Sequence, residues 1–178
     1  MRIHVSMIAA LVCLAGSAGA KPDSAGWVIT SPRGGRAEIV RSYEHYDLSS
    51  LHAHAFLALR PGRSTSELTT RDRATGAVEL ISREGRDLRC GDVFALRVDG
   101  EFVVRGDATP LSLVTTKKAT PDVHQWRVGN CKAAIPIVTS APIALVNVKE
   151  NDALVGCKRP WGPPFCWDEK QTIGTPTP

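Results

Sequence analysis

Beyond its first twenty residues, the 178-residue sequence contains no apolar run long enough to form a transmembrane helix. It contains no G-x-S-x-G motif and no phosphate-binding glycine loop that leads into a helix. No stretch shows a sustained helical stripe of apolar residues. These absences argue against a membrane-spanning protein, against the common hydrolase and nucleotide-binding enzymes, and against a helical bundle.

The sequence also has no concentration of charge of one sign. It contains 22 Lys and Arg against 18 Asp and Glu, a formal net charge of +4, and its arginines are spread along the chain among acidic residues. A nucleic-acid-binding protein gathers basic residues on one element. We therefore expect no nucleic-acid partner and a well-solvated surface.

The first twenty residues have the pattern of a secretory signal peptide. Arg2 precedes an apolar run at residues 7–15, and Ala18 and Ala20 occupy the small-residue positions before a cleavage site. We expect cleavage between Ala20 and Lys21 and a secreted or periplasmic protein. Residues 21–169 would then form a single domain, and residues 170–178 a flexible tail.

Cysteine is scarce, and its number is even once the signal peptide with Cys13 is removed. An even number behind a secretory signal indicates two disulfides formed in an oxidising compartment. Three connectivities are possible, and we favour Cys90–Cys131 together with Cys157–Cys166, which closes a short proline-rich loop. A structural zinc site is the alternative, but the sequence has no C-x-x-C pair.

Apolar residues alternate with a period of two along most of the chain, which predicts an all-β protein of about ten to twelve short strands. The clearest local pattern is a hairpin over residues 92–106, in which Asp99-Gly100 suits the positive φ angles of a type I′ turn. Strands are also expected within residues 26–30, 37–43, 51–59, 67–81, 110–116, 123–129, 134–139 and 142–148.

Three short stretches resemble one another and indicate an internal repeat. They are "FLALR" at 56–60, "VFALR" at 93–97 and "PIALV" at 142–146, and the last two are each followed by a turn and another short apolar run. Three related units of 40–50 residues favour a β-trefoil-like barrel. An antiparallel β-sandwich is the alternative.

His52 and His54 lie two residues apart in "SSLHAHAFLALR", so they would share one face of a strand. Such a pair could supply two ligands to zinc or copper, with a third from Glu44, His45, Asp47 or His124. The competing interpretation is that both are ordinary neutral side chains on a partly exposed sheet.

The segment "GCKRPWGPPFCWDE" at 156–169 predicts a stiff loop if Cys157 and Cys166 are bonded. Aromatic residues and arginine dominate binding energy at interfaces, and a stiff loop loses little entropy on binding. The contact residues would be Arg159, Trp161, Phe165 and Trp167, and the tryptophan rings could also stack on a sugar. Alternatively, the loop folds back as a lid over the barrel.

These patterns together predict an exported, non-catalytic β-domain that binds a protein or a carbohydrate through this aromatic loop. The first alternative is a periplasmic metal-binding protein that uses His52 and His54, and the second is a small secreted hydrolase or a protease inhibitor. In general plan the chain resembles the Kunitz-type plant trypsin inhibitors, through its four cysteines and the short final cysteine spacing. The rest of the sequence departs from their pattern. The resemblance implies that Lys158 is presented to a protease, because the proline after Arg159 blocks cleavage there.

Overall fold

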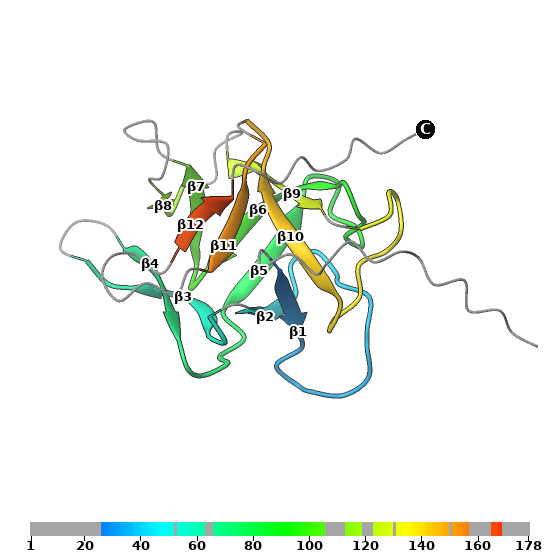
Figure 1. Ribbon diagram of the computed structural model, residues 1–178, viewed down its shortest axis with the longest axis horizontal. Coiled ribbons are helices and arrows are strands. Elements are labelled where there is room, and N and C mark those ends of the chain that lie inside the picture. Colours follow the sequence, from blue (N-terminus) through cyan, green and yellow to red (C-terminus); the bar gives the residue numbers. More distant parts are fainter. Residues whose placement is uncertain are drawn as a thin grey trace, which may run out of the picture.

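The computed structural model describes residues 26–51, 53–62, 66–105, 113–118, 123–129, 131–149, 151–156 and 165–168. Their regular structure is β, in strands β1 to β12 (Figure 1). In the described part of the chain, no helix is long and apolar enough to cross a membrane. The strands are β1 (Trp27–Thr30), β2 (His45–Ser50), β3 (Phe56–Arg60), β4 (Glu67–Arg71), β5 (Val78–Ser82), β6 (Val93–Val98), β7 (Glu101–Arg105), β8 (Leu113–Thr116), β9 (Trp126–Gly129), β10 (Pro142–Asn147), β11 (Ala153–Gly156) and β12 (Phe165–Asp168).

Six of these strands close into a barrel. Strand β1 pairs with β2, β2 with β5, β5 with β6, β6 with β9 and β9 with β10, and all of these pairs are antiparallel. Strand β10 then returns to β1, with Trp27 opposite Ile143, and this pair completes the ring. Closure leaves no free edge on these six strands. The antiparallel sandwich alternative is therefore wrong, and the barrel prediction is confirmed.

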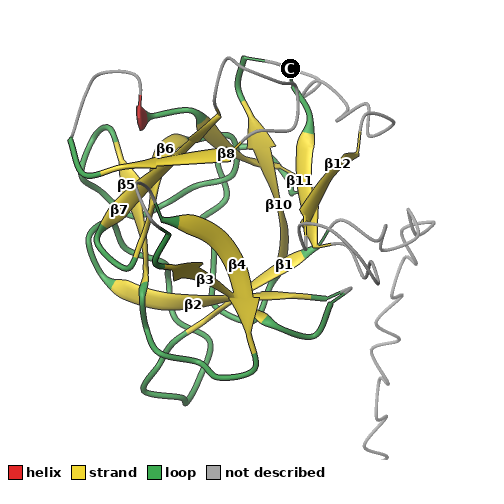
Figure 2. Ribbon diagram, turned by 90° about the vertical axis from the view of Figure 1, so that its left-hand side faces the viewer, coloured by secondary structure: helices red, strands yellow, loops and turns green. Residues whose placement is uncertain are grey.

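Each third of the barrel continues into an outer strand pair. Strands β3 and β4 extend from β2, β7 and β8 extend from β6, and β11 and β12 extend from β10. The three pairs lie at different positions around the ring (Figure 2). In each repeat, the chain thus forms two strands of the barrel wall and then an outer hairpin. This order occurs three times in succession. We call these repeats unit 1 (β1–β4), unit 2 (β5–β8) and unit 3 (β9–β12).

The first of the three repeats lies at a different position in the chain from the one that the sequence predicts. The second barrel strands of the three units start at His45, Val93 and Pro142, which are 48 and 49 residues apart. "VFALR" and "PIALV" are therefore equivalent, as expected. "FLALR" at 56–60 is not, because it forms the outer strand β3, and its place in the barrel is taken by "HYDLSS" at 45–50. The similarity of "FLALR" to the other two arose from common apolar residues.

Apolar side chains from equivalent positions fill the barrel in layers. One layer combines Leu48, Leu96 and Leu145, each of them fully buried. A second layer is made of Tyr46, Phe94 and Ile143, which also occupy equivalent positions. A third layer is made of Ile29, Leu80 and Val128. The interior is thus a packed core built by threefold repetition.

A ring of three hydrogen bonds joins the segments that link the two barrel strands of each unit. The Val40 amide donates to the carbonyl of Ile137 at 2.8 Å, the Leu88 amide to that of Val40 at 2.8 Å, and the Ile137 amide to that of Leu88 at 2.9 Å. All three side chains are buried. Each of these residues both donates and accepts one backbone hydrogen bond within the ring. The three linking segments therefore satisfy one another's backbone groups without pairing with a further strand.

Two tryptophans attach outer hairpins to the barrel. The Nε1–H of Trp27 donates to the carbonyl of Leu154 in β11 at 2.8 Å, and that of Trp126 donates to the carbonyl of Val103 in β7 at 2.7 Å. The two tryptophans occupy equivalent positions in β1 and β9. Unit 2 has the smaller Val78 at the start of β5.

The structure confirms several predicted strands and corrects others. The Asp99-Gly100 hairpin is confirmed, with φ angles of 47° and 84° at these two residues. The strands predicted at 26–30 and 142–148 and the pair predicted within 67–81 are also confirmed. The predicted strands at 37–43 and 134–139 are wrong. These segments form only isolated bridges, such as Ile39 with Val138, because their amides belong to the three-membered ring.

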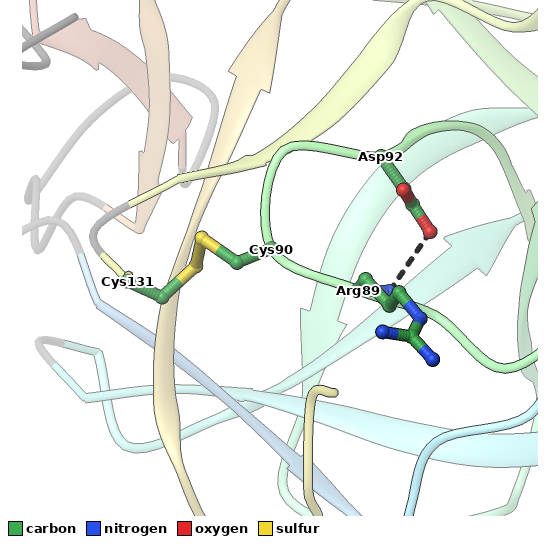
Figure 3. The surroundings of a disulfide bond; sticks show 4 residues. All are labelled: Arg89, Cys90, Asp92 and Cys131. Carbon is green, nitrogen blue, oxygen red and sulfur yellow. Dashed lines mark hydrogen bonds between the residues drawn. A yellow bond between two sulfur atoms is a disulfide. The ribbon is translucent and has the colours of Figure 1, made fainter. Parts of the chain in front are cut away.

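The predicted Cys90–Cys131 disulfide is present (Figure 3), with an S–S distance of 2.00 Å and a sequence separation of 41 residues. Cys90 follows the ring residue Leu88, and Cys131 follows β9. The bond therefore ties unit 2 to unit 3. The predicted Cys157–Cys166 pair lies outside the described residues and side chains, and it stays a prediction. So do the signal peptide at 1–20 and the tail at 170–178.

We expect Leu96→Ala to lower the free energy of unfolding by about 3 kcal/mol, because it leaves a cavity in a fully buried layer of three leucines. Leu51→Ala provides the control, since Leu51 is 44% exposed, and it should change stability by less than about 0.5 kcal/mol. Urea denaturation of both variants measures the difference. Equal losses would contradict the layered core.

The Cys90→Ala/Cys131→Ala double variant should lose about 4 kcal/mol of stability on the loop-entropy model, because the unfolded chain regains the freedom of a long loop. Denaturation midpoints of the variant and the native protein give this value. Titration of free thiols in the native chain should find none of the four mature cysteines reactive. A reactive Cys157 or Cys166 would show that the second predicted pairing is wrong.

Candidate functional site

His54, the described member of the predicted histidine pair, does not lie on a strand. Strand β2 ends at Ser50, and a turn occupies the chain before β3 begins at Phe56. In this turn the His54 amide donates to the Ser50 carbonyl at 2.9 Å, and the Ala53 amide donates to the Ser50 hydroxyl at 3.1 Å. His54 has a φ of 52° and is exposed. The continuous strand predicted over 51–59 is therefore wrong, because the Ser50 side chain and the left-handed His54 reverse the chain.

The other candidate metal ligands lie in different surroundings. Asp47 is buried, and its Oδ1 accepts bonds from the amides of Thr75 and Gly76 at 2.7 and 2.8 Å. Glu44 accepts a bond from the Tyr46 hydroxyl at 3.1 Å. No group of three His, Cys, Asp or Glu side chains within the described ranges could hold a metal ion. His52 lies outside the described residues, so metal binding by His52 and His54 stays a prediction.

The predicted aromatic loop is only partly described. Arg159 and Trp161 lie outside the described residues. Phe165 and Trp167 belong to strand β12 rather than to a loop, which corrects the prediction for these two positions. In the register of β12 against β11, Phe165 pairs with Gly156 and Trp167 with Leu154. Residues 157–164 therefore connect the two strands of the outer hairpin of unit 3.

A polar cavity of about 450 Å³ lies where unit 2 meets unit 3. It is lined by the end of β5 and the turn that follows, by the corner leading into β6, by one residue before β9 and by the residue after β10. Four separate segments thus contribute to one surface, because the barrel order places β6 beside β9 and β9 beside β10. The lining residues are Ser82, Arg83, Glu84, Arg86, Gly91, Asp92, Val93, His124 and Val148.

The carboxylates of the cavity are held by Arg86 and, for Asp92, by one backbone amide. Arg86 contacts Glu84 through Nε, and its Nη2 lies 3.2 Å from Oδ1 of Asp92. The other Asp92 oxygen accepts a bond from the Arg89 amide at 2.9 Å (Figure 3). The hydrogen bond from Arg86 lowers the pKa of Glu84. The Glu84 carboxylate is therefore charged at neutral pH, and Glu84 and Asp92 share a single guanidinium.

His124 lies in the same cavity beside a second cation. Burial, followed by the positive charge of Arg83, lowers the pKa of His124 below 6.5, its ordinary value. The imidazole is therefore neutral at pH 7 and has one nitrogen to donate and one to accept a hydrogen bond. Chemically, the cavity offers polar contacts of both kinds to a small ligand.

Sequence reasoning did not find this cavity. In the sequence, His124 is one of four candidates for a third metal ligand, and Arg83, Glu84 and Arg86 resemble ordinary solvated charges. No spacing in the chain links residues 82–93 with 124 and 148, because their proximity depends on the barrel closing. The threefold repeat is the one sequence signal that could have brought these segments together.

No protein-family model matches the chain, and comparisons with curated proteins and with solved structures give no significant match.

Because folding lowers the pKa of His124, the unfolded chain binds a proton more readily than the folded chain does. The contribution of His124 to stability is therefore fully present above pH 6.5 and is lost as the pH falls toward the lowered value in the folded protein. We expect the stability of the native protein to fall more between pH 7.5 and pH 5.5 than that of His124→Gln. Urea denaturation at both pH values tests this, and equal falls would contradict it.

Proposed function

We propose that this protein is an exported, non-catalytic binding domain, in which the barrel presents the outer hairpin of unit 3 to a protein or carbohydrate ligand. The observation that carries the proposal is the pairing of β11 with β12, because the segment 157–164 joins these two strands in the sequence. This segment includes Arg159 and Trp161, and Phe165 and Trp167 follow on β12. Aromatic residues and arginine are the types that most often dominate binding energy.

The base of this hairpin is fixed to the barrel. Ala153 and Leu154 are fully buried, β11 pairs with the barrel strand β10, and the Leu154 carbonyl accepts the indole hydrogen bond of Trp27. Arg105 of unit 2 also pairs with Asp152, just before β11, at 3.2 Å. A hairpin held at its base loses less conformational entropy when its end binds a ligand.

The packed interior also directs a ligand to the outside. Leucine and other apolar side chains fill the barrel in layers, so contacts with a partner must come from the hairpins and from the segments around the rim. Binding residues are commonly carried on such connecting segments above a rigid scaffold. The Cys90–Cys131 disulfide supports an oxidising compartment, in agreement with the expected signal peptide.

A glycan array and a trypsin-binding assay on the mature protein test the proposal. Trp161→Ala/Trp167→Ala should weaken the binding found in either assay by at least about tenfold, because truncating an aromatic hot-spot residue commonly costs 2 kcal/mol or more. Tyr43→Ala provides the matched control, since Tyr43 is 61% exposed and lies in unit 1. It should bind as the native protein does.

Two outcomes would contradict this function. One is equal binding by the native protein and the double tryptophan variant, which would move the contact surface away from the hairpin. The other is an absence of binding in both assays. Loss of trypsin binding in Lys158→Ala, with glycan binding absent, would identify the ligand as a serine protease.

A further inference from the structure

The cavity between units 2 and 3 contains one cation without a carboxylate partner. Arg86 faces both Glu84 and Asp92, whereas no carboxylate of the described residues lies within ion-pair distance of Arg83. Arg83 is close enough to His124 for its charge to disfavour the imidazolium. An anion that entered the cavity would therefore meet an unpaired guanidinium and a neutral imidazole that can donate a hydrogen bond.

The remaining lining selects among anions. Val93 and Val148 also line the cavity, and Val148 is 45% exposed, so an apolar group would remove some of its surface from water. Glu84 and Asp92 lie in the same lining, and they would repel a doubly charged group such as phosphate more strongly than a singly charged one. The volume of about 450 Å³ is within the range of small-molecule sites.

We propose that this cavity binds a small organic monocarboxylate, with Arg83 contacting the carboxylate, His124 making a second polar contact, and Val93 and Val148 against the apolar body. This site is separate from the outer hairpin of unit 3 and does not depend on the function proposed for it. The Arg86 pairs hold the turn after β5 against the corner before β6, so part of the site is already formed without a ligand.

Titration of the mature protein with benzoate, followed by backbone amide resonances, tests the site. Benzoate should shift the resonances of Val93, His124 and Val148 and reach saturation, whereas uncharged benzamide at the same concentrations should not. Arg83→Gln should weaken benzoate binding at least tenfold. Arg73→Gln is the matched control, because Arg73 is also an exposed arginine but lies outside the cavity lining.

The same titration at several pH values tests the role of His124. A bound carboxylate favours the imidazolium, so the complex should take up a proton, and benzoate affinity should rise as the pH is lowered from 8 to 6. The other charged groups around the cavity are Arg83, Glu84, Arg86 and Asp92, and His124→Gln leaves all of them in place. This variant should bind benzoate with little dependence on pH over that range.

Four results would overturn the proposal. Benzamide that binds as well as benzoate would make the cavity an apolar site without anion recognition. Phosphate that binds more tightly than benzoate would show that the charge of the anion alone decides which anion binds. Finally, the absence of saturable shifts, or equal benzoate affinity in Arg83→Gln and the native protein, would mean that Arg83 recognises no carboxylate. Circular dichroism of each variant confirms that the comparison is between folded chains.

Discussion

The pairing of β1 with β10 is the interaction on which the rest of this structure depends. These strands are separated by more than a hundred residues, and their antiparallel contact turns an open sheet into a closed ring. Closure makes the three linking segments converge, so that Val40, Leu88 and Ile137 can form their cyclic hydrogen bonds. It also brings the leucine layer together and places the indole of Trp27 beside the carbonyl of Leu154. Without the closed ring, these buried groups would have no partners.

In this closed barrel, the residues that stabilise the fold are different from the residues that can contact a ligand. The interior is occupied by apolar layers, which leaves the hairpins and the junctions between units for contact with other molecules. The two proposed sites occupy these two kinds of position: one is the end of the unit 3 hairpin, and the other is the junction where units 2 and 3 meet. The Cys90–Cys131 bond crosses that same junction, so it holds together the two units whose residues line the cavity.

Local patterns predicted much of this fold, and long-range contacts account for the rest. The alternation of apolar residues predicted strands β6, β7 and β10, and Asp99-Gly100 predicted the hairpin turn. Both signals depend only on residues that are neighbours in the sequence. The segments at 37–43 and 134–139 have the β-rich composition of strands, yet the amides of Val40 and Ile137 bond to the other linking segments. The His54 turn was hidden by an alternating run of alanine and leucine. No local pattern predicts the cavity, since its charged residues meet only after the barrel closes.

Native-state hydrogen exchange of the Val40, Leu88 and Ile137 amides tests the closed, threefold frame most directly. If the ring of hydrogen bonds forms as part of one cooperative barrel, all three amides should exchange only through global unfolding, with the same free energy and the same dependence on denaturant. Rapid exchange at any one of the three, through local opening with little denaturant dependence, would contradict the account. It would mean that the barrel is not closed as a single unit.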